Sequence, residues 1–314
     1  MAEKKNFKTS IGGQALMEGI LMRGPENQAI VCRGESGLIE KVEPLKYTKE
    51  KYPILGVPFI RGIFIFISSL VNGMQALTYS AELLPEDMQE EPDKIDLWIE
   101  NHFSEEKAKK LIIGVAVVLG IALSLFLFVF LPTFIIGLIK PIHDNYIARN
   151  LSEGLLKVVI LILYMKLCSY QSDIKRVFSY HGAEHKTIFC YEHGKELTVE
   201  NVRPESRFHP RCGTSFLLVV VFVSILVNSV VKSTNTLARI GYHLLLLPVV
   251  VGISYEINRW CGLHDNKLSA ILSYPGKYLQ RITTSEPDDG MIECAIRAME
   301  LVIPQKQGSD EWGK

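Results

Sequence analysis

The chain has 314 residues, 48 % of them hydrophobic, and its 34 Lys and Arg are balanced by 34 Asp and Glu. A neutral total argues against nucleic-acid binding, which usually goes with a basic excess. The six cysteines form no C-x-x-C pair, and the polar N-terminus is no secretory leader, so we expect reduced thiols inside a cell. The apolar residues are gathered into long runs, which indicates an integral membrane protein.

The first 54 residues are soluble in character and contain nine Lys or Arg. Two short runs, residues 29–33 and 38–42, flank the turn-prone sequence Gly-Glu-Ser-Gly at 34–37. This spacing predicts two strands joined by a turn. We therefore expect a small β-containing unit at the N-terminus.

Residues 58–84 carry apolar side chains at helical spacing, with polar side chains mainly on another face. Such a segment can lie in the interface plane, cross the membrane or re-enter it, and the sequence does not decide. Residues 82–93 form an acidic run that we interpret as a solvated linker. Ser104 is expected to cap a helix that continues into the next apolar run.

Four later runs are predicted to cross the membrane as helices, because backbone amides in lipid must be satisfied internally. Residues 111–131 contain no charge and no proline, and about 20 such residues span a hydrocarbon core of about 30 Å. The other three runs are 155–168, 215–231 and 240–257, and the last contains Pro248 as a tolerated kink.

Basic residues predict the orientation of these helices. The loop 173–214 contains seven Lys or Arg, whereas loops 132–153 and 232–239 contain two each. We therefore expect a multi-pass protein of the cell membrane with this loop and both termini in the cytoplasm. A fifth span at 58–84 would break the rule, so an interfacial or re-entrant course is preferred there.

The predicted fold is mainly α: a polytopic transmembrane bundle of about four spans plus an amphipathic or re-entrant helix, with the small β-containing unit. In the C-terminal tail, Asp288 or Asp289 is expected to cap an amphipathic helix that reaches about residue 303. The predicted divisions of the chain are 1–54, 55–84, 85–110, 111–258 and 259–314.

The passage from His181 to His185 is the first that suggests chemistry. On a helix these two histidines share a face, a spacing that suits two imidazoles on one metal ion. Together with Glu184 they fit the H-x-x-E-H pattern, in which the glutamate acts as general base. Gly182 weakens the prediction of a regular helix here.

A second pair, His209 and Cys212, lies in the same loop and is similar to the tight Cys/His turns of zinc sites. The predicted metal ligands are His181, His185, His209 and Cys212, and the expected cofactor is a divalent, zinc-like ion. Four ligands would make a structural site, whereas three would leave a position for water, with Glu184 as catalytic base. Without a metal, the histidines would bond to Glu184, Glu192 or backbone.

Glu256 lies near the end of the last apolar run, where an acid normally faces the protein interior. We expect it to pair with Arg259, three residues further on, and a role as metal ligand is the alternative. His243 lies toward the opposite end of that run and is not placed in the site.

Several stretches together resemble the YqhQ-like family of bacterial membrane proteins, a family of unknown function whose members are often labelled predicted metal-dependent enzymes. The resemblance implies metal dependence, and its motif residues are the same His181, Glu184, His185, His209 and Cys212. The matching stretches are 12–25, 180–188, 197–204, 208–216, 255–260 and 283–296.

These observations favour a metal-dependent hydrolase at the cytoplasmic face, acting on a lipid-linked or membrane-protein substrate. The alternative is a non-catalytic scaffold or partner of a transport, translocation or envelope machinery, in which the His/Cys loop is structural. A transporter is less favoured, because the predicted spans contain few ionisable groups. The expected partners are the bilayer and a membrane protein, and the sequence leaves the substrate and the oligomeric state open.

Overall fold

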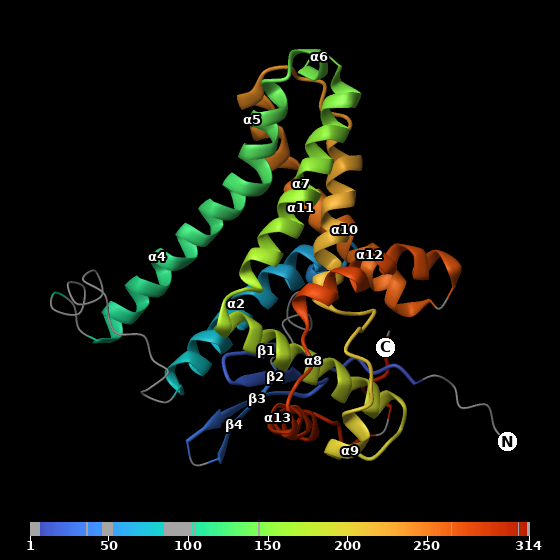
Figure 1. The fold of residues 1–314 in the computed structure, drawn as a ribbon. Helices are drawn as coiled ribbons and strands as arrows, with labels where there is room; N and C mark the ends of the chain where they lie inside the picture. Colours follow the sequence, from blue (N-terminus) through green and yellow to red (C-terminus); the bar gives the residue numbers. More distant parts are fainter. Residues whose placement is uncertain are drawn as a thin grey trace. The chain divides into compact units, whose positions relative to one another are not determined.

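The computed structural model describes residues 7–35, 37–45, 53–84, 102, 105–143, 145–264, 266–306 and 308–312. The predicted acidic linker therefore lies almost entirely outside the described residues. The chain is mainly helical, with one small antiparallel sheet near its N-terminus (Figure 1). It divides into two compact units. The first comprises Met1–Pro85, Ile162–Val223 and Pro248–Lys314, and the second comprises Glu86–Leu161 and Ser224–Leu247.

The sheet of the first unit has four strands in the order β1-β2-β3-β4, each antiparallel to its neighbour. The strands are β1 (Gly12–Leu16), β2 (Gly19–Arg23), β3 (Asn27–Gly34) and β4 (Gly37–Pro44). The last two are the predicted strands, and their hairpin closes where Gly34 pairs with Gly37. The expected β-containing N-terminal unit is confirmed, with two more strands than predicted.

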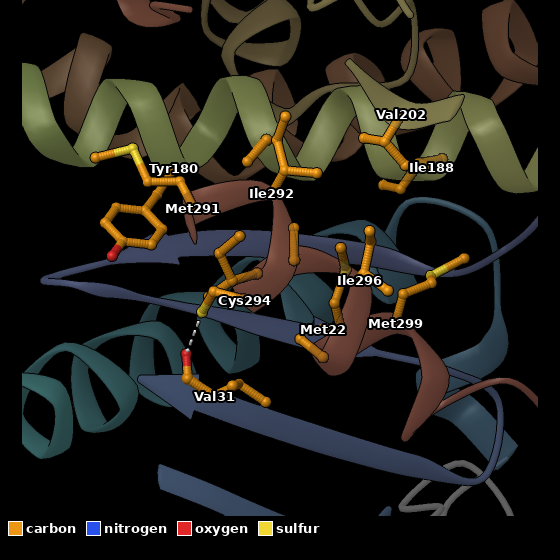
Figure 2. Close-up of a cluster of buried hydrophobic side chains, with 14 of the residues drawn as sticks. Met22, Val31, Tyr180, Ile188, Val202, Met291, Ile292, Cys294, Ile296 and Met299 are labelled. Atoms are coloured by element: carbon orange, nitrogen blue, oxygen red, sulfur yellow. Dashed lines mark hydrogen bonds between the residues drawn. The ribbon is translucent and has the colours of Figure 1, made fainter. Parts of the chain in front are cut away.

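Alternating side chains give the sheet two buried faces. Ile20, Met22 and Val31 pack against α8 (Ser172–Glu192) and α13 (Asp289–Glu300). Figure 2 shows this core, in which the Cys294 thiol donates to the Val31 carbonyl at 3.2 Å. The neighbouring side chains of the other face pack against the end of α2 (Ile60–Glu82); they are Leu16, Leu21, Ile30 and Cys32.

The remaining helices of the first unit are short or amphipathic. They are η1 (Pro53–Gly56), α9 (Val199–Val202) and α12 (Lys267–Thr283). Asn266 caps α12 through a reciprocal bond with Ser269, which satisfies two backbone donors at the helix start. Asp288 caps α13, as predicted, by accepting from the Met291 amide, although α13 ends at Glu300 rather than near residue 303.

Three helices of the described chain are long and apolar enough to cross a membrane, fewer than the four predicted spans. They are α2, the continuous helix Leu111–Gly137 and α11 (Thr236–Leu263). The second of these consists of α4 (Glu105–Leu125), η3 (Phe126–Phe130) and α5 (Leu131–Gly137), and the short α6 (Lys140–His143) follows it. The predicted runs 111–131 and 240–257 lie within these helices, and Pro248 is inside α11.

The other two predicted spans do not belong to helices that are long and apolar enough to cross a membrane, and the reasons differ. The run 155–168 belongs to α7 (Tyr146–Cys168), whose last 18 residues carry Glu153, Lys157 and Lys166. The run 215–231 belongs to α10 (Gly213–Asn228), which has 16 residues and is shorter than the roughly 20 residues that a span needs. The segment that the sequence left undecided, in contrast, forms α2 and has the length of a span.

The second unit buries a charged cluster formed by Arg149 and Glu153 of α7 and Arg239 of α11. Glu153 accepts from the Nε atoms of both arginines at 3.1 Å, and from Arg239 Nη2 at 2.8 Å. All three residues lie outside the predicted spans 155–168 and 240–257, so they do not bear on the expectation that those spans hold few ionisable groups. Both helices begin earlier than the apolar runs, at Tyr146 and Thr236, so the sequence placed these residues in or beside loops.

Candidate metal centre

Helix α8 places His181 and His185 on one face, with ring centroids 4.3 Å apart. The helix continues through Gly182 without interruption. A Cβ atom at Gly182 would collide with the carbonyl oxygen of Ser285. The glycine therefore allows the segment after α12 to lie directly against α8, and its low helix propensity is offset by this packing.

Both imidazoles are oriented by backbone carbonyls. His181 Nδ1 lies 2.9 Å from the Thr283 oxygen, and His185 Nδ1 lies 2.6 Å from the Arg207 oxygen. Because a carbonyl only accepts, each Nδ1 donates a proton, so the lone pair of the neutral imidazole is on Nε2. Metal-binding histidines almost always have such an outer partner, which fixes the tautomer and the ring orientation.

The thiol of Cys212 completes a group of three donors. Its Sγ lies 3.1 Å from His181 Nε2, and one ligand atom from each of His181, His185 and Cys212 lies within 4.8 Å of the others. Cys212 directly precedes α10, whose Thr214 amide points to the sulfur at 3.4 Å. A helix N-terminus of this kind favours a thiolate.

Electrostatic interactions favour the charged forms of Cys212 and His181, the thiolate and the imidazolium. Burial would raise the pKa of the Cys212 thiol, but the imidazoles of His181 and His185 outweigh it and hold the pKa well below its ordinary value. Burial would lower the pKa of His181, yet Cys212 and Glu184 raise it to about 9. Both shifts favour the thiolate, the form that binds metals.

Glu184 lies on the same helix and lines the same cavity, whose volume is about 390 Å³. Its Oε1 accepts from the Gly13 amide of β1 at 2.9 Å. Burial raises the pKa of its carboxyl group, and the two imidazoles oppose this shift. The cavity thus has a carboxylate beside the three donors, in the wall formed by β1 and α8.

His209 lies outside the close group, although it lines the cavity. Its ring centroid is 5.6 Å from that of His185, and its Nε2 is 3.6 Å from Glu192 Oε2. Glu192 also pairs with Arg211, so a charged pair at the end of α8 draws the ring away from the donors. The structure brings together three of the four predicted ligands, and a metal-binding role of His209 stays a prediction.

Three other residues with ligand-type side chains have different partners. Cys190 donates to the Glu196 carbonyl at 3.5 Å, and His193 lies 3.0 Å from a Glu205 oxygen. Glu256 pairs with Arg61 of α2, whose Nε donates to it at 2.7 Å, and not with Arg259 as predicted. The expected pair of Glu256 with Arg259 is wrong because Arg61 of α2 offers a bidentate guanidinium. The prediction considered only residues three positions apart on the same helix and could not include this distant partner.

Several residues that hold the site were not found from the sequence. Gln280 is fully buried; it accepts from the His209 amide at 2.8 Å and donates to the His209 carbonyl at 2.7 Å. Glu286 pairs with Arg207, whose carbonyl orients His185. Glu18, at the positive φ of 47° between β1 and β2, binds the Arg176 guanidinium through two bonds of 2.5 and 2.6 Å. Of these residues, only Glu18 and Glu286 lie in the stretches that resemble the family, so the sequence offered a reason to consider only these two.

The fold and the site define a class: a helical protein with membrane-length apolar helices and a buried cluster of two histidines and one cysteine, against a small sheet. Residues 57–305 match the family described as "Protein of unknown function (DUF1385)", and the chain belongs to this family. It is 35 % identical over 304 residues to "Uncharacterized protein YqhQ" of Bacillus subtilis (strain 168), covering 96 % of this chain and 94 % of that protein. The predicted YqhQ-like membership is confirmed. No solved structure matches the chain.

Proposed function

We propose that this chain is a membrane-embedded, metal-dependent hydrolase whose metal ion is held by His181, His185 and Cys212. The observation that carries the proposal is the convergence of these three donors within 4.8 Å, with both Nδ1 atoms bound to backbone carbonyls. A hydrogen-bonded polar cluster without a metal would not need two imidazoles, each held at Nδ1 by a backbone carbonyl, beside one thiol.

The donor chemistry favours zinc. Imidazole and thiolate are the usual zinc ligands, and structural sites take four protein ligands whereas catalytic sites take three. A zinc ion with three protein ligands supplies, when bound, a water molecule with a pKa of about 7. The proposed set is of the catalytic kind.

Glu184 is the proposed general base. Its carboxylate is fixed by the Gly13 amide and lines the cavity next to the donors. Burial raises its pKa from the ordinary value, which makes the carboxylate a stronger base for taking up a proton and passing it to a leaving group. The backbone contact keeps the carboxylate in place without neutralising it.

The substrate is proposed to be associated with the membrane, because the chain has three helices of membrane-spanning length. The basic loop 173–214 supports a multi-pass course through the cell membrane with this loop in the cytoplasm. Both termini are proposed to lie on the same side, which requires an even number of crossings, as in the four spans predicted from the sequence. A lipid-linked molecule or a membrane protein could reach a site at that face.

A non-catalytic scaffold is the second candidate, and one observation favours it. Glu184 links β1 to α8, and His185 links α8 to the loop carbonyl of Arg207. A metal at this position would cross-link the same segments and make the loop a rigid docking surface for another membrane protein.

Metal analysis of the purified chain tests the binding site. We expect about one zinc per chain in the wild type. Cys212→Ser should weaken zinc binding more than about 100-fold, since changes in the outer shell alone cost about 10–100-fold. Cys190→Ser is the matched control on α8, because that thiol is buried but only contacts the Glu196 carbonyl. A wild type without metal, or an unchanged affinity in Cys212→Ser, would reject the site.

Glu184→Gln separates the enzyme from the scaffold. The amide can still accept from Gly13 but cannot take up a proton. We expect this variant to keep its zinc and to fail in a strain that depends on the protein. Full cellular function with zinc retained would instead support the scaffold.

A further inference from the structure

Helix α12 exposes a row of large apolar side chains outside the proposed site. The exposed fractions are 55 % for Leu268, 67 % for Ile271 and 67 % for Tyr274. Tyr278 lies on the same side and is 58 % exposed, and Leu272, which is 41 % exposed, lies between this side and the buried face. Soluble surfaces rarely gather so many large apolar residues on one helix face, so this face needs an apolar environment.

Basic side chains border this apolar face. Lys267, Lys277 and Arg281 are exposed, and the Arg281 guanidinium lies 4.9 Å from the centre of the Tyr278 ring. At 3.6 residues per turn Lys277 and Arg281 fall together, between the tyrosines and the buried face, and Lys267 lies in the first turn on the side of the tyrosines. Residues 267–283 contain no Asp or Glu. An apolar face with a basic edge is the pattern of a helix that lies in a membrane interface.

The preceding helix places α12 at a membrane boundary. The 28 residues of α11 are about 42 Å long, more than the hydrocarbon core of about 30 Å. Only residues 264–266 separate its end at Leu263 from the start of α12 at Lys267. The first turn of α12 therefore cannot be far from the headgroup layer.

A cavity of about 510 Å³ lies where α11 ends and α12 begins. Trp260, Leu263, Leu268 and Leu272 supply its apolar wall, and Arg259 and Glu256 supply the polar part. Glu256 is already bound to Arg61. Within the part of the chain that the structure describes, Arg259 has no hydrogen-bond or ion-pair partner, so its guanidinium is available to an anion.

We propose that α12 lies in the plane of the membrane interface and, with the cavity at Arg259, binds an anionic phospholipid. The apolar wall takes part of an acyl chain and Arg259 takes the phosphate, while the basic edge of α12 attracts other anionic headgroups. This site does not depend on a metal ion. It nevertheless bears on the proposed function, because the buried face of α12 holds the metal centre through Gln280 and the Thr283 carbonyl. Lipid bound to α12 would keep that centre at the level of the headgroups.

Quenching of Trp260 by brominated lipids tests the proposal on the full-length chain. The chain is reconstituted in phosphatidylcholine vesicles that contain equal fractions of either brominated phosphatidylglycerol or brominated phosphatidylcholine. Trp260→Phe gives the background from Trp98 and Trp312. We expect phosphatidylglycerol to be preferred at Trp260, and Arg259→Gln to reduce this preference about fivefold, the effect of one basic residue near an anionic surface.

Arg203→Gln is the matched control, because Arg203 is exposed and pairs with Asp289 away from the cavity. It should keep the wild-type preference. Equal quenching by both lipids in the wild type would overturn the proposal, and so would displacement of the lipid by inorganic phosphate, which would assign the site to a free anion. Zinc content is measured on the same samples. A wild type that holds zinc but shows no lipid preference would refute this inference and leave the metal centre intact, whereas a wild type that prefers the anionic lipid but holds no zinc would do the reverse.

Discussion

Two buried polar clusters in this protein use their charges in opposite ways. In the second unit, both oxygens of Glu153 accept from guanidinium groups, and the remaining contacts of Arg149 and Arg239 include the carbonyls of Thr234, Val231 and Ser233. In the first unit, the imidazoles of the metal centre use only Nδ1 for backbone contacts, and Nε2 faces a thiolate beside a cavity.

The comparison teaches that burial of charge alone does not identify a functional site. A cluster whose donors and acceptors satisfy one another clamps helices together, and its value is structural. A cluster whose ligand atoms face a cavity still has atoms that can bind a metal ion or another ligand. Two predictions separate these two roles, and a third concerns an ion pair outside both clusters.

The largest expected effect is on the charged cluster. Glu153→Gln removes the carboxylate that compensates two fully buried arginines, and breaking such a pair costs about 3–5 kcal/mol. We expect a large loss of thermal stability and of folded protein in detergent. Glu300→Gln is the control, because that carboxylate is exposed and pairs only with Arg297, so its effect should stay below about 0.5 kcal/mol. Equal stability of the two variants would show that the charged cluster at Glu153 does not hold the helices together.

The next effect concerns the support of the metal centre. Gln280→Ala removes both bonds to the His209 backbone and frees the turn that leads to Cys212. We expect zinc affinity to fall about 10–100-fold, as for other outer-shell changes, when measured by competition with a chelator. Lys277→Ala, an exposed change on the same helix, should leave the affinity unchanged. If Gln280→Ala also binds zinc normally, the turn is held by other contacts.

The smallest effect is a pH dependence of stability away from both clusters. Glu205 is buried, which would raise its pKa, but bonds from Lys195 at 2.7 Å and His193 at 3.0 Å lower it below the ordinary value. Its contribution is therefore complete above about pH 4.3 and is lost as the pH falls through the lowered pKa. Because both partners are about half exposed, we expect only about 1 kcal/mol.

Chemical unfolding at pH 7 and at pH 3 measures this contribution. Glu205→Gln should be less stable at pH 7 and should lose less stability on acidification than the wild type. Glu200→Gln, an exposed change nearby on α9, should follow the wild-type curve. A parallel acid response of Glu205→Gln and the wild type would show that the pair contributes nothing.

Local patterns predicted much of the fold. The hairpin of β3 and β4 was predictable from alternation and a turn of Gly-Glu-Ser-Gly, and α13 from its cap at Asp288. The strands β1 and β2 were missed, because β2 is buried on both faces and such a strand shows no alternation. Likewise, α10 has 16 apolar-rich residues, and composition did not show where the helix ends.

The sequence by itself determined that His181 and His185 share a helix face and that Cys212 follows a tight turn, because spacing of three or four residues fixes local geometry. Only the tertiary structure decided that Cys212 meets these histidines while His209 turns to Glu192, and that Arg61 rather than Arg259 binds Glu256. These outcomes depend on contacts between segments far apart in the chain, where the strongest available partner prevails over the nearest one in sequence.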